Sequence, residues 1–161
     1  MLLRRVALWF ALAGGLIAGI VALNTVVSVV ARATIARPVP GDIELTQFGI
    51  ALAISLCLPW CQLHRANIIV DFFTQKMAPR RRLLLDAFGA LLLAAMCALL
   101  SWRTAVGALA VQEAGETSMI IGLPMWWTYA SLAPGLALTA LVALVQATCL
   151  LRGRALSATA P

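Results

Sequence analysis

The amino-acid sequence predicts an all-α membrane protein with four transmembrane helices, and two observations carry that prediction. Of its 161 residues, 63% are hydrophobic and only 11% are charged, a balance far outside the range of soluble proteins. Most of the chain also lies in four apolar stretches, and each has the about 20 residues that a helix needs to cross a hydrocarbon core. Runs rich in leucine and alanine are typical of helices rather than of the alternating strands of a barrel. The predicted spans are residues 6–30, 44–63, 83–111 and 124–151, within one transmembrane domain over residues 1–161.

The positions of the charges predict that both termini lie in the cytoplasm. Basic residues gather before the first span, between the second and third, and after the fourth, and four crossings put these regions on one side. The other side has Arg32 and Arg37 in its first loop, and Glu113 and Glu116 in its second. Because cytoplasmic loops carry an excess of Lys and Arg, this bias sets the topology and explains the net charge of +6 without a nucleic-acid partner. The cytoplasmic basic residues are Arg4, Arg5, Arg65, Lys76, Arg80, Arg81, Arg82, Arg152 and Arg154.

The first span contains Gly15 and Gly19 at a GxxxG spacing, which lets two helix backbones approach closely. Two interpretations are open: packing within the chain, which we prefer because the motif alone is a weak signal, or an interface with another protein. The span is longer than the about 7–15 apolar residues of a secretory signal, so we expect it to stay uncleaved. After the first loop, Asp42 and Glu44 stand at the start of the second helix, where negative charge suits the helix dipole.

The connection between the second and third spans predicts a short amphipathic helix over residues 66–77, which Pro79 ends. It is too short to cross a membrane, so we expect it to lie flat at the cytoplasmic interface. Arg80, Arg81 and Arg82 follow at headgroup level and can attract anionic lipid, by about 1 kcal/mol each. Its apolar side has Ala66, Ile69, Val70, Phe73 and Met77, and its polar side has Asn67, Asp71, Thr74 and Gln75.

The third span has Ala90, Ala94 and Ala98 at four-residue spacing, a second smooth face for close packing. Arg103 lies about 12 Å inside the outer end of this helix, where a charge is costly. Its side chain either snorkels to the interface, beside Trp102, or pairs with an outer acid such as Glu44.

Around the start of the fourth span, Pro124 suits the first turn of a helix. Trp126, Trp127 and Tyr129 then predict an aromatic belt at the outer interface.

No motif in the sequence predicts catalysis, and we expect neither an enzyme nor a cofactor. The four cysteines are interpreted as small apolar packing residues, because none lies in an outer loop. Cys57, Cys61 and His64 share a helical face, yet a structural metal site needs a fourth ligand and Pro59 disturbs the turn between them. We therefore expect no metal.

An ordered set of short motifs runs along nearly the whole chain. It consists of Arg32 at the end of the first helix, Glu44-Leu45 opening the second, Asn67-Ile68-Ile69-Val70-Asp71 with Pro79, Gly115-Glu116-Thr117-Ser118, Gly122-Leu123-Pro124-Met125-Trp126, Tyr129 and Pro134-Gly135. In order and spacing, this set resembles the small membrane subunit of the tripartite ATP-independent periplasmic (TRAP) transporters. Two positions depart from that pattern: Asn67, where the family often has a histidine, and Ala33, where it often has an aromatic residue.

The resemblance implies a protein of the bacterial inner membrane that takes part in uptake of organic acid anions with a sodium gradient. A periplasmic binding protein would deliver the substrate, and a large multispan subunit would carry the substrate and sodium sites. The small subunit would brace that partner, and the Glu113–Trp127 loop would be a docking surface for the binding protein. The residues that we expect to be structural or interface determinants are Arg32, Glu44, Asp71, Arg103, Glu116, Pro124 and Trp126.

Two alternatives come from other classes of protein. One is a four-helix membrane redox protein that uses its cysteines with a quinone or disulfide partner. The other is a self-sufficient small exporter, although the first span has no acidic residue of the kind on which such exporters depend.

Overall fold

Four long helices make up almost all of the structure, a computed structural model that describes residues 2–35, 40–64 and 79–152. Each helix is long and apolar enough to cross a membrane, which confirms the predicted all-α fold with four spans. The predicted interfacial helix at residues 66–77, with Asp71, lies outside the described residues. The helices are α1 (Leu2–Ile35), α2 (Asp42–Leu63), α4 (Pro79–Ala114) and α5 (Trp126–Leu151).

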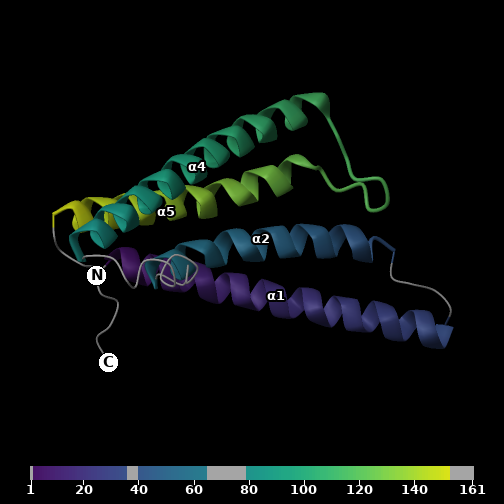
Figure 1. Ribbon diagram of the computed structural model, residues 1–161. Coiled ribbons are helices and arrows are strands. Elements are labelled where there is room, and N and C mark those ends of the chain that lie inside the picture. Colours follow the sequence, from purple (N-terminus) through teal and green to yellow (C-terminus); the bar gives the residue numbers. More distant parts are fainter. Residues whose placement is uncertain (1, 36–39, 65–78, 153–161) are drawn as a thin grey trace.

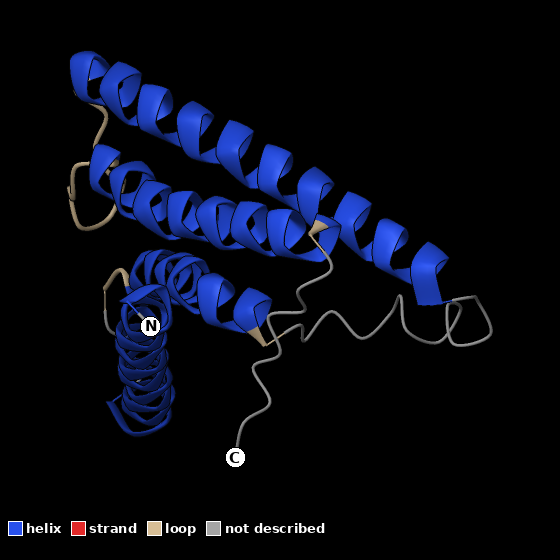
Figure 2. Cartoon of the chain, turned by 90° about the vertical axis from the view of Figure 1, so that its left-hand side faces the viewer, coloured by secondary structure: helices blue, strands red, loops and turns tan. Residues whose placement is uncertain are grey.

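The helices follow one another in a single row in the order α1, α2, α5, α4 (Figure 1). Close contacts join α1 to α2, α2 to α5 and α5 to α4, whereas α1 barely touches α5. The chain therefore forms two antiparallel hairpins, α1–α2 and α4–α5, that meet along α2 and α5; Figure 2 shows this stacking from the side. The start of α1 and the end of α5 lie at one end of the helix axes, and the α4–α5 loop lies at the opposite end (Figure 1). By an end of the row we mean one of these two ends of the helix axes, and by an edge we mean an outer helix, α1 or α4.

The α4–α5 hairpin is held together by small side chains of α4. Ala90 and Ala94 are buried as predicted, but Ala98 is exposed and Cys97 takes its place in the seam. The prediction of a face with a strict four-residue spacing was wrong at this point. Helices that pack side by side keep contact by alternating steps of three and four residues, because 3.6 residues make one turn. The buried set in this seam is Ala87, Ala90, Ala94, Cys97 and Ala108.

The GxxxG pair of α1 does not pack within the described chain, so our preferred interpretation of that motif was wrong. Gly15 and Gly19 are exposed, and a Cβ atom added to either would meet nothing within 4 Å. The glycine that α2 approaches is Gly14, where a Cβ would lie 2.8 Å from Cys57 Sγ and 2.9 Å from the Ala53 carbonyl oxygen. The smooth side of α1 therefore faces outward from the row.

The contact between the two hairpins combines a close backbone approach with polar bonds. Gly135 of α5 lies against Ser55, and a Cβ at this glycine would overlap the Ser55 side chain and backbone. The Ser55 hydroxyl donates a hydrogen bond to the Leu132 carbonyl at 2.8 Å. On the other side of α5, the Ser101 hydroxyl donates to the Ala133 carbonyl at 2.9 Å. Hydroxyls from both neighbouring helices thus bond to the α5 backbone just before Pro134.

Toward the other end of the same contact, two buried glutamines connect α2 and α5. Gln62 Nε2 donates to Gln146 Oε1 at 2.8 Å, and Gln146 Nε2 donates to the Gln62 carbonyl at 2.8 Å. A buried amide that lacks a partner is costly, so this reciprocal pairing selects one register between the helices.

Candidate functional site

The most structured polar site lies at the loop end of the row, where Glu44 binds the α4–α5 loop. The Glu44 carboxylate accepts hydrogen bonds from the Ser118 hydroxyl and from the backbone N–H groups of Ile120 at 3.2 Å and Ile121 at 3.3 Å. Glu44 is placed for this because α2 begins at Asp42, directly after Gly41 in a left-handed conformation (φ 77°). Ionised acceptors make stronger hydrogen bonds than neutral ones, so one side chain ties the second helix to a loop more than 70 residues away.

The loop itself is a compact turn rather than a free connection. Two backbone hydrogen bonds join its two sides: the Ser118 N–H donates to the Leu123 carbonyl at 2.8 Å, and the Met125 N–H donates to the Glu116 carbonyl at 3.0 Å. Gly122 adopts a left-handed conformation (φ 70°), which a residue with a Cβ rarely takes. The loop therefore presents a defined surface at the end of the row.

Pro124 lies in this turn, which corrects its predicted place in the first turn of the fourth helix. The helix begins two residues later, at Trp126. Pro124 pairs instead with Thr117 in an isolated bridge, and its carbonyl accepts a hydrogen bond from the Trp127 N–H at 3.3 Å. Proline is tolerated at this point because the backbone bonds on either side of the bridge come from Ser118 and Met125, so no N–H group is needed from residue 124.

A hollow of about 400 Å³ opens between the start of α2 and the loop. Two acidic residues contribute to its wall, Glu44 and Glu116, while Phe48 and two methionines supply apolar surface. One of these, Met119, is fully exposed. The lining residues are Glu44, Gln47, Phe48, Glu116, Thr117, Ser118, Met119 and Met125.

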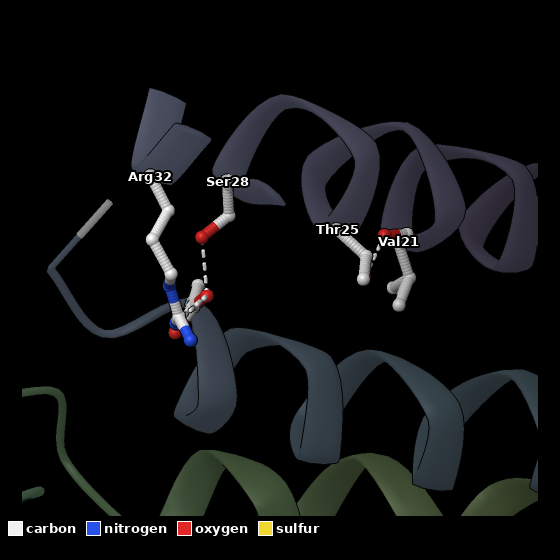
Figure 3. Close-up of polar contacts among 5 residues, drawn as sticks. Val21, Thr25, Ser28 and Arg32 are labelled. Atoms are coloured by element: carbon white, nitrogen blue, oxygen red, sulfur yellow. Dashed lines mark hydrogen bonds and ion pairs between the residues drawn. The ribbon is translucent and has the colours of Figure 1, made fainter. Parts of the chain in front are cut away.

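A second polar cluster joins the end of α1 to the start of α2 (Figure 3). The Ser28 hydroxyl donates to the Asp42 carboxylate, and Arg32 Nη2 lies 3.9 Å from Asp42 Oδ2. Ser28 is buried, whereas the Arg32 side chain is 62% exposed. An ion pair with such an exposed arginine contributes little to stability by itself. The hydrogen bond from Ser28 is therefore the stronger connection between the two helices.

Arg103 belongs to neither cluster. It is exposed on α4, and Glu44, the acid considered for it, bonds to the loop instead. Between described residues, the one ion pair joins Arg32 to Asp42. The structure therefore contradicts the Glu44 pairing.

The predicted site residues thus fall into separate places. Glu44 and Glu116 meet at the hollow, with Pro124 and Trp126 at the adjoining end of the loop, whereas Arg32 and Arg103 lie elsewhere. Sequence reasoning missed Ser118, Asp42 as a partner of Arg32, and the buried glutamines. The glutamines carried a signal, because an amide inside an apolar span usually has a specific partner.

The cysteine and histidine residues of α2 were also considered as metal ligands. In the described parts of the chain, no group of three or more His, Cys, Asp or Glu side chains could hold a metal ion. His64 is near Trp60 instead: the rings are 4.2 Å apart, and His64 Nδ1 lies 3.0 Å from the Trp60 carbonyl oxygen.

Comparison with known proteins identified a family. The family model described as "Tripartite ATP-independent periplasmic transporters, DctQ component" matches residues 21–153, well over half of the chain. No curated protein and no solved structure matches at a significant level.

Proposed function

This chain belongs to the family of DctQ components of tripartite ATP-independent periplasmic transporters, and from that premise we propose that it braces the large translocating subunit of such a transporter. As a member of that family it is the small membrane subunit of a TRAP transporter. The observation that carries the bracing role is the single row of helices: its inner contacts are closed by packing, while no other described helix covers the outer sides of α1 and α4.

The described part of the row holds no arrangement suited to moving a substrate or an ion. The contact between α2 and α5 is filled by Gly135 against Ser55 and by the paired glutamines. Ion-coupled transport usually uses carboxylates inside the membrane. Here the described carboxylates lie in the loop or within about two turns of a helix end. They are Asp42, Glu44, Asp86, Glu113 and Glu116. These features support a structural subunit whose partner does the transport.

In this proposal both termini lie in the cytoplasm of a bacterium with an inner membrane. The charges of the described residues support that orientation. Arg4, Arg5, Arg81 and Arg152 are exposed at the end of the row that holds the chain termini. The acids Asp42, Glu44, Glu113 and Glu116 lie at the other end. The exposed Arg81 at the start of α4 would contact anionic lipid headgroups of the cytoplasmic leaflet.

The hollow beside Glu44 is the surface that we propose for docking of the periplasmic substrate-binding protein. It lies at the end of the row that this orientation exposes to the periplasm, and its loop is held in shape by Glu44. We also propose organic acid anions as the substrates of the assembled transporter and a sodium gradient as its driving force.

Reconstitution tests the proposed function directly. The chain would be coexpressed with the large membrane subunit and the binding protein, purified, and placed in liposomes with an inward sodium gradient. We expect uptake of a radiolabelled carboxylate by the full assembly and none by the chain alone. Transport by the chain alone would identify a self-sufficient carrier and would overturn the bracing role.

A variant without cysteines adds a second test to the same assay. Replacement of Cys57, Cys61, Cys97 and Cys149 by alanine should leave a carrier that still takes up substrate. Loss of uptake with intact assembly would favour the redox alternative.

A further inference from the structure

Arg103 of α4 is the charged residue that the proposed function leaves unexplained. It comes two residues after Ser101, whose hydroxyl bonds to α5, so about 200° of helical rotation carries it to the far side of α4. The side chain is accordingly exposed, away from the seam with α5.

Contacts with α5 set the depth of this residue. Gly107 is level with Tyr129, because a Cβ at this glycine would lie 4.0 Å from the tyrosine ring. Ser101 is level with Ala133, to whose carbonyl it donates. Arg103 lies between these two levels, about 6 Å before Gly107 along α4, on the side toward Pro79. Aromatic residues at helix ends mark the membrane interface, so Arg103 lies inward of Trp126, Trp127 and Tyr129.

An arginine at that depth could snorkel, so that its guanidinium reaches the headgroup region, but the geometry of the helix opposes this. In an α-helix every Cα–Cβ bond leans toward the N-terminus. Arg103 lies in the last third of α4, so its side chain starts in the direction of Pro79, away from the nearer interface. This holds for either orientation of the chain in the membrane.

Among the described residues, no carboxylate forms an ion pair with Arg103. Asp42 pairs with Arg32, and Glu44 bonds to Ser118 and the loop backbone. Cations inside a membrane tend to face a partner or a cavity, and none of the described carboxylates supplies this counter-charge.

The residues around Arg103 form a continuous exposed face of α4. They follow it at helical spacing, and apart from the arginine they are apolar or small. We call this the Arg103 face; it consists of Leu92, Met96, Leu99, Arg103, Val106 and Ala110.

We propose that a helix of the large membrane subunit covers the Arg103 face and presents a carboxylate to Arg103. This assignment rests on the proposed function and adds to it the edge of the row at which the partner lies. Charge complementarity selects a protein carboxylate over lipid, because lipid tails offer no counter-charge at this depth.

The test uses the assembled complex in lipid nanodiscs. Arg103→Leu is compared with Arg152→Leu, which removes an exposed arginine just after the end of α5. Removal of one partner of a buried ion pair is strongly destabilising, so we expect Arg103→Leu to lower copurification of the large subunit by at least about tenfold. Arg103→Lys should restore part of it, and Arg152→Leu should match the wild type.

A photo-crosslinking residue at Leu99 gives a second measurement that keeps Arg103 intact. It should form an adduct with the large subunit, whereas the same residue at Leu109, about 80° around α4 from Leu99, should form fewer. Adducts with lipid alone at Leu99, or normal copurification of Arg103→Leu, would overturn the assignment. Failure of the wild-type chain itself to copurify would instead overturn the proposed function, and the Arg103 assignment with it.

Discussion

α1 and α5 are both apolar enough to cross a membrane, yet they occupy opposite kinds of position in the row. Of the most apolar part of α5, 39% is buried within the protein, against 11% for α1. α5 lies between two neighbours, whereas α1 has α2 on one side only. The difference teaches that hydropathy places a helix in the membrane but does not place it in the protein. In this chain, position follows from small and polar side chains at particular turns.

The strongest test of that comparison is a bulky side chain at the centre of α5. Gly135→Leu would drive its side chain into Ser55, including its backbone, and helix backbones cannot shift as a flexible side chain can. We expect the two hairpins to separate, with a loss of about 3 kcal/mol or more in stability. Thermal unfolding in detergent and a cysteine cross-link between α2 and α5 would measure the effect. An unchanged melting temperature would contradict this account of the hairpin contact.

A smaller effect is expected at the buried amides. Gln146→Leu removes the acceptor of Gln62 Nε2 and the donor to the Gln62 carbonyl, while keeping the bulk of the side chain. We expect a loss of about 1–3 kcal/mol in stability, the range for a buried polar group deprived of its partner. The matched control is Thr148→Val on the exposed side of the same helix. Equal melting temperatures for the two variants would show that the pair adds nothing to the α2–α5 contact.

The loop end of the row should respond more locally. Glu44→Gln removes the charge that strengthens bonds to Ser118, Ile120 and Ile121. Hydrogen bonds to charged groups contribute about 1 kcal/mol more than neutral ones, so residues 117–123 should exchange their amide hydrogens roughly fivefold faster. Hydrogen exchange read by mass spectrometry measures this, with Glu116→Gln as the control. Faster exchange throughout α2 would show instead that Glu44 supports the whole helix.

The edge helix should tolerate what the inner helix does not. Gly15→Leu places its side chain in open space, so we expect the stability of the isolated chain to change by less than about 0.5 kcal/mol. The control is Gly14→Leu, one residue away, which would collide with Cys57 and Ala53. The same melting experiment measures both variants. A large loss for Gly15→Leu and none for Gly14→Leu would reverse the assignment of the two faces of α1.

Local features of the sequence were enough to predict the elements of this fold. The four spans and their helical nature were predicted correctly because burial in lipid depends on apolar length alone. The family was identified from ordered short motifs, which the match over residues 21–153 confirms. Glu44 was also chosen as a structural residue, although its partners were not foreseen, and its wider role stays a prediction.

The errors have a common cause. Gly14 and Gly15 are adjacent glycines in the same apolar stretch, and nothing local tells which of them α2 will approach. Ala98 and Cys97 differ in the same way, by one step of about 100° around α4. A pattern of small residues shows that close packing can occur, but not on which side of the helix the neighbour lies.

By itself, the sequence therefore determined that four apolar helices cross a membrane and that the chain belongs to a family of transporter subunits. The tertiary structure alone decided the order of the helices in the row and the partner of Glu44. It also decided which faces of α1 and α4 stay free. The physical reason is the separation along the chain over which each effect acts. Partition into lipid sums over residues along the chain, whereas neighbours in the row are chosen by contacts between residues far apart in it, such as Ser55 with Leu132 and Glu44 with Ser118.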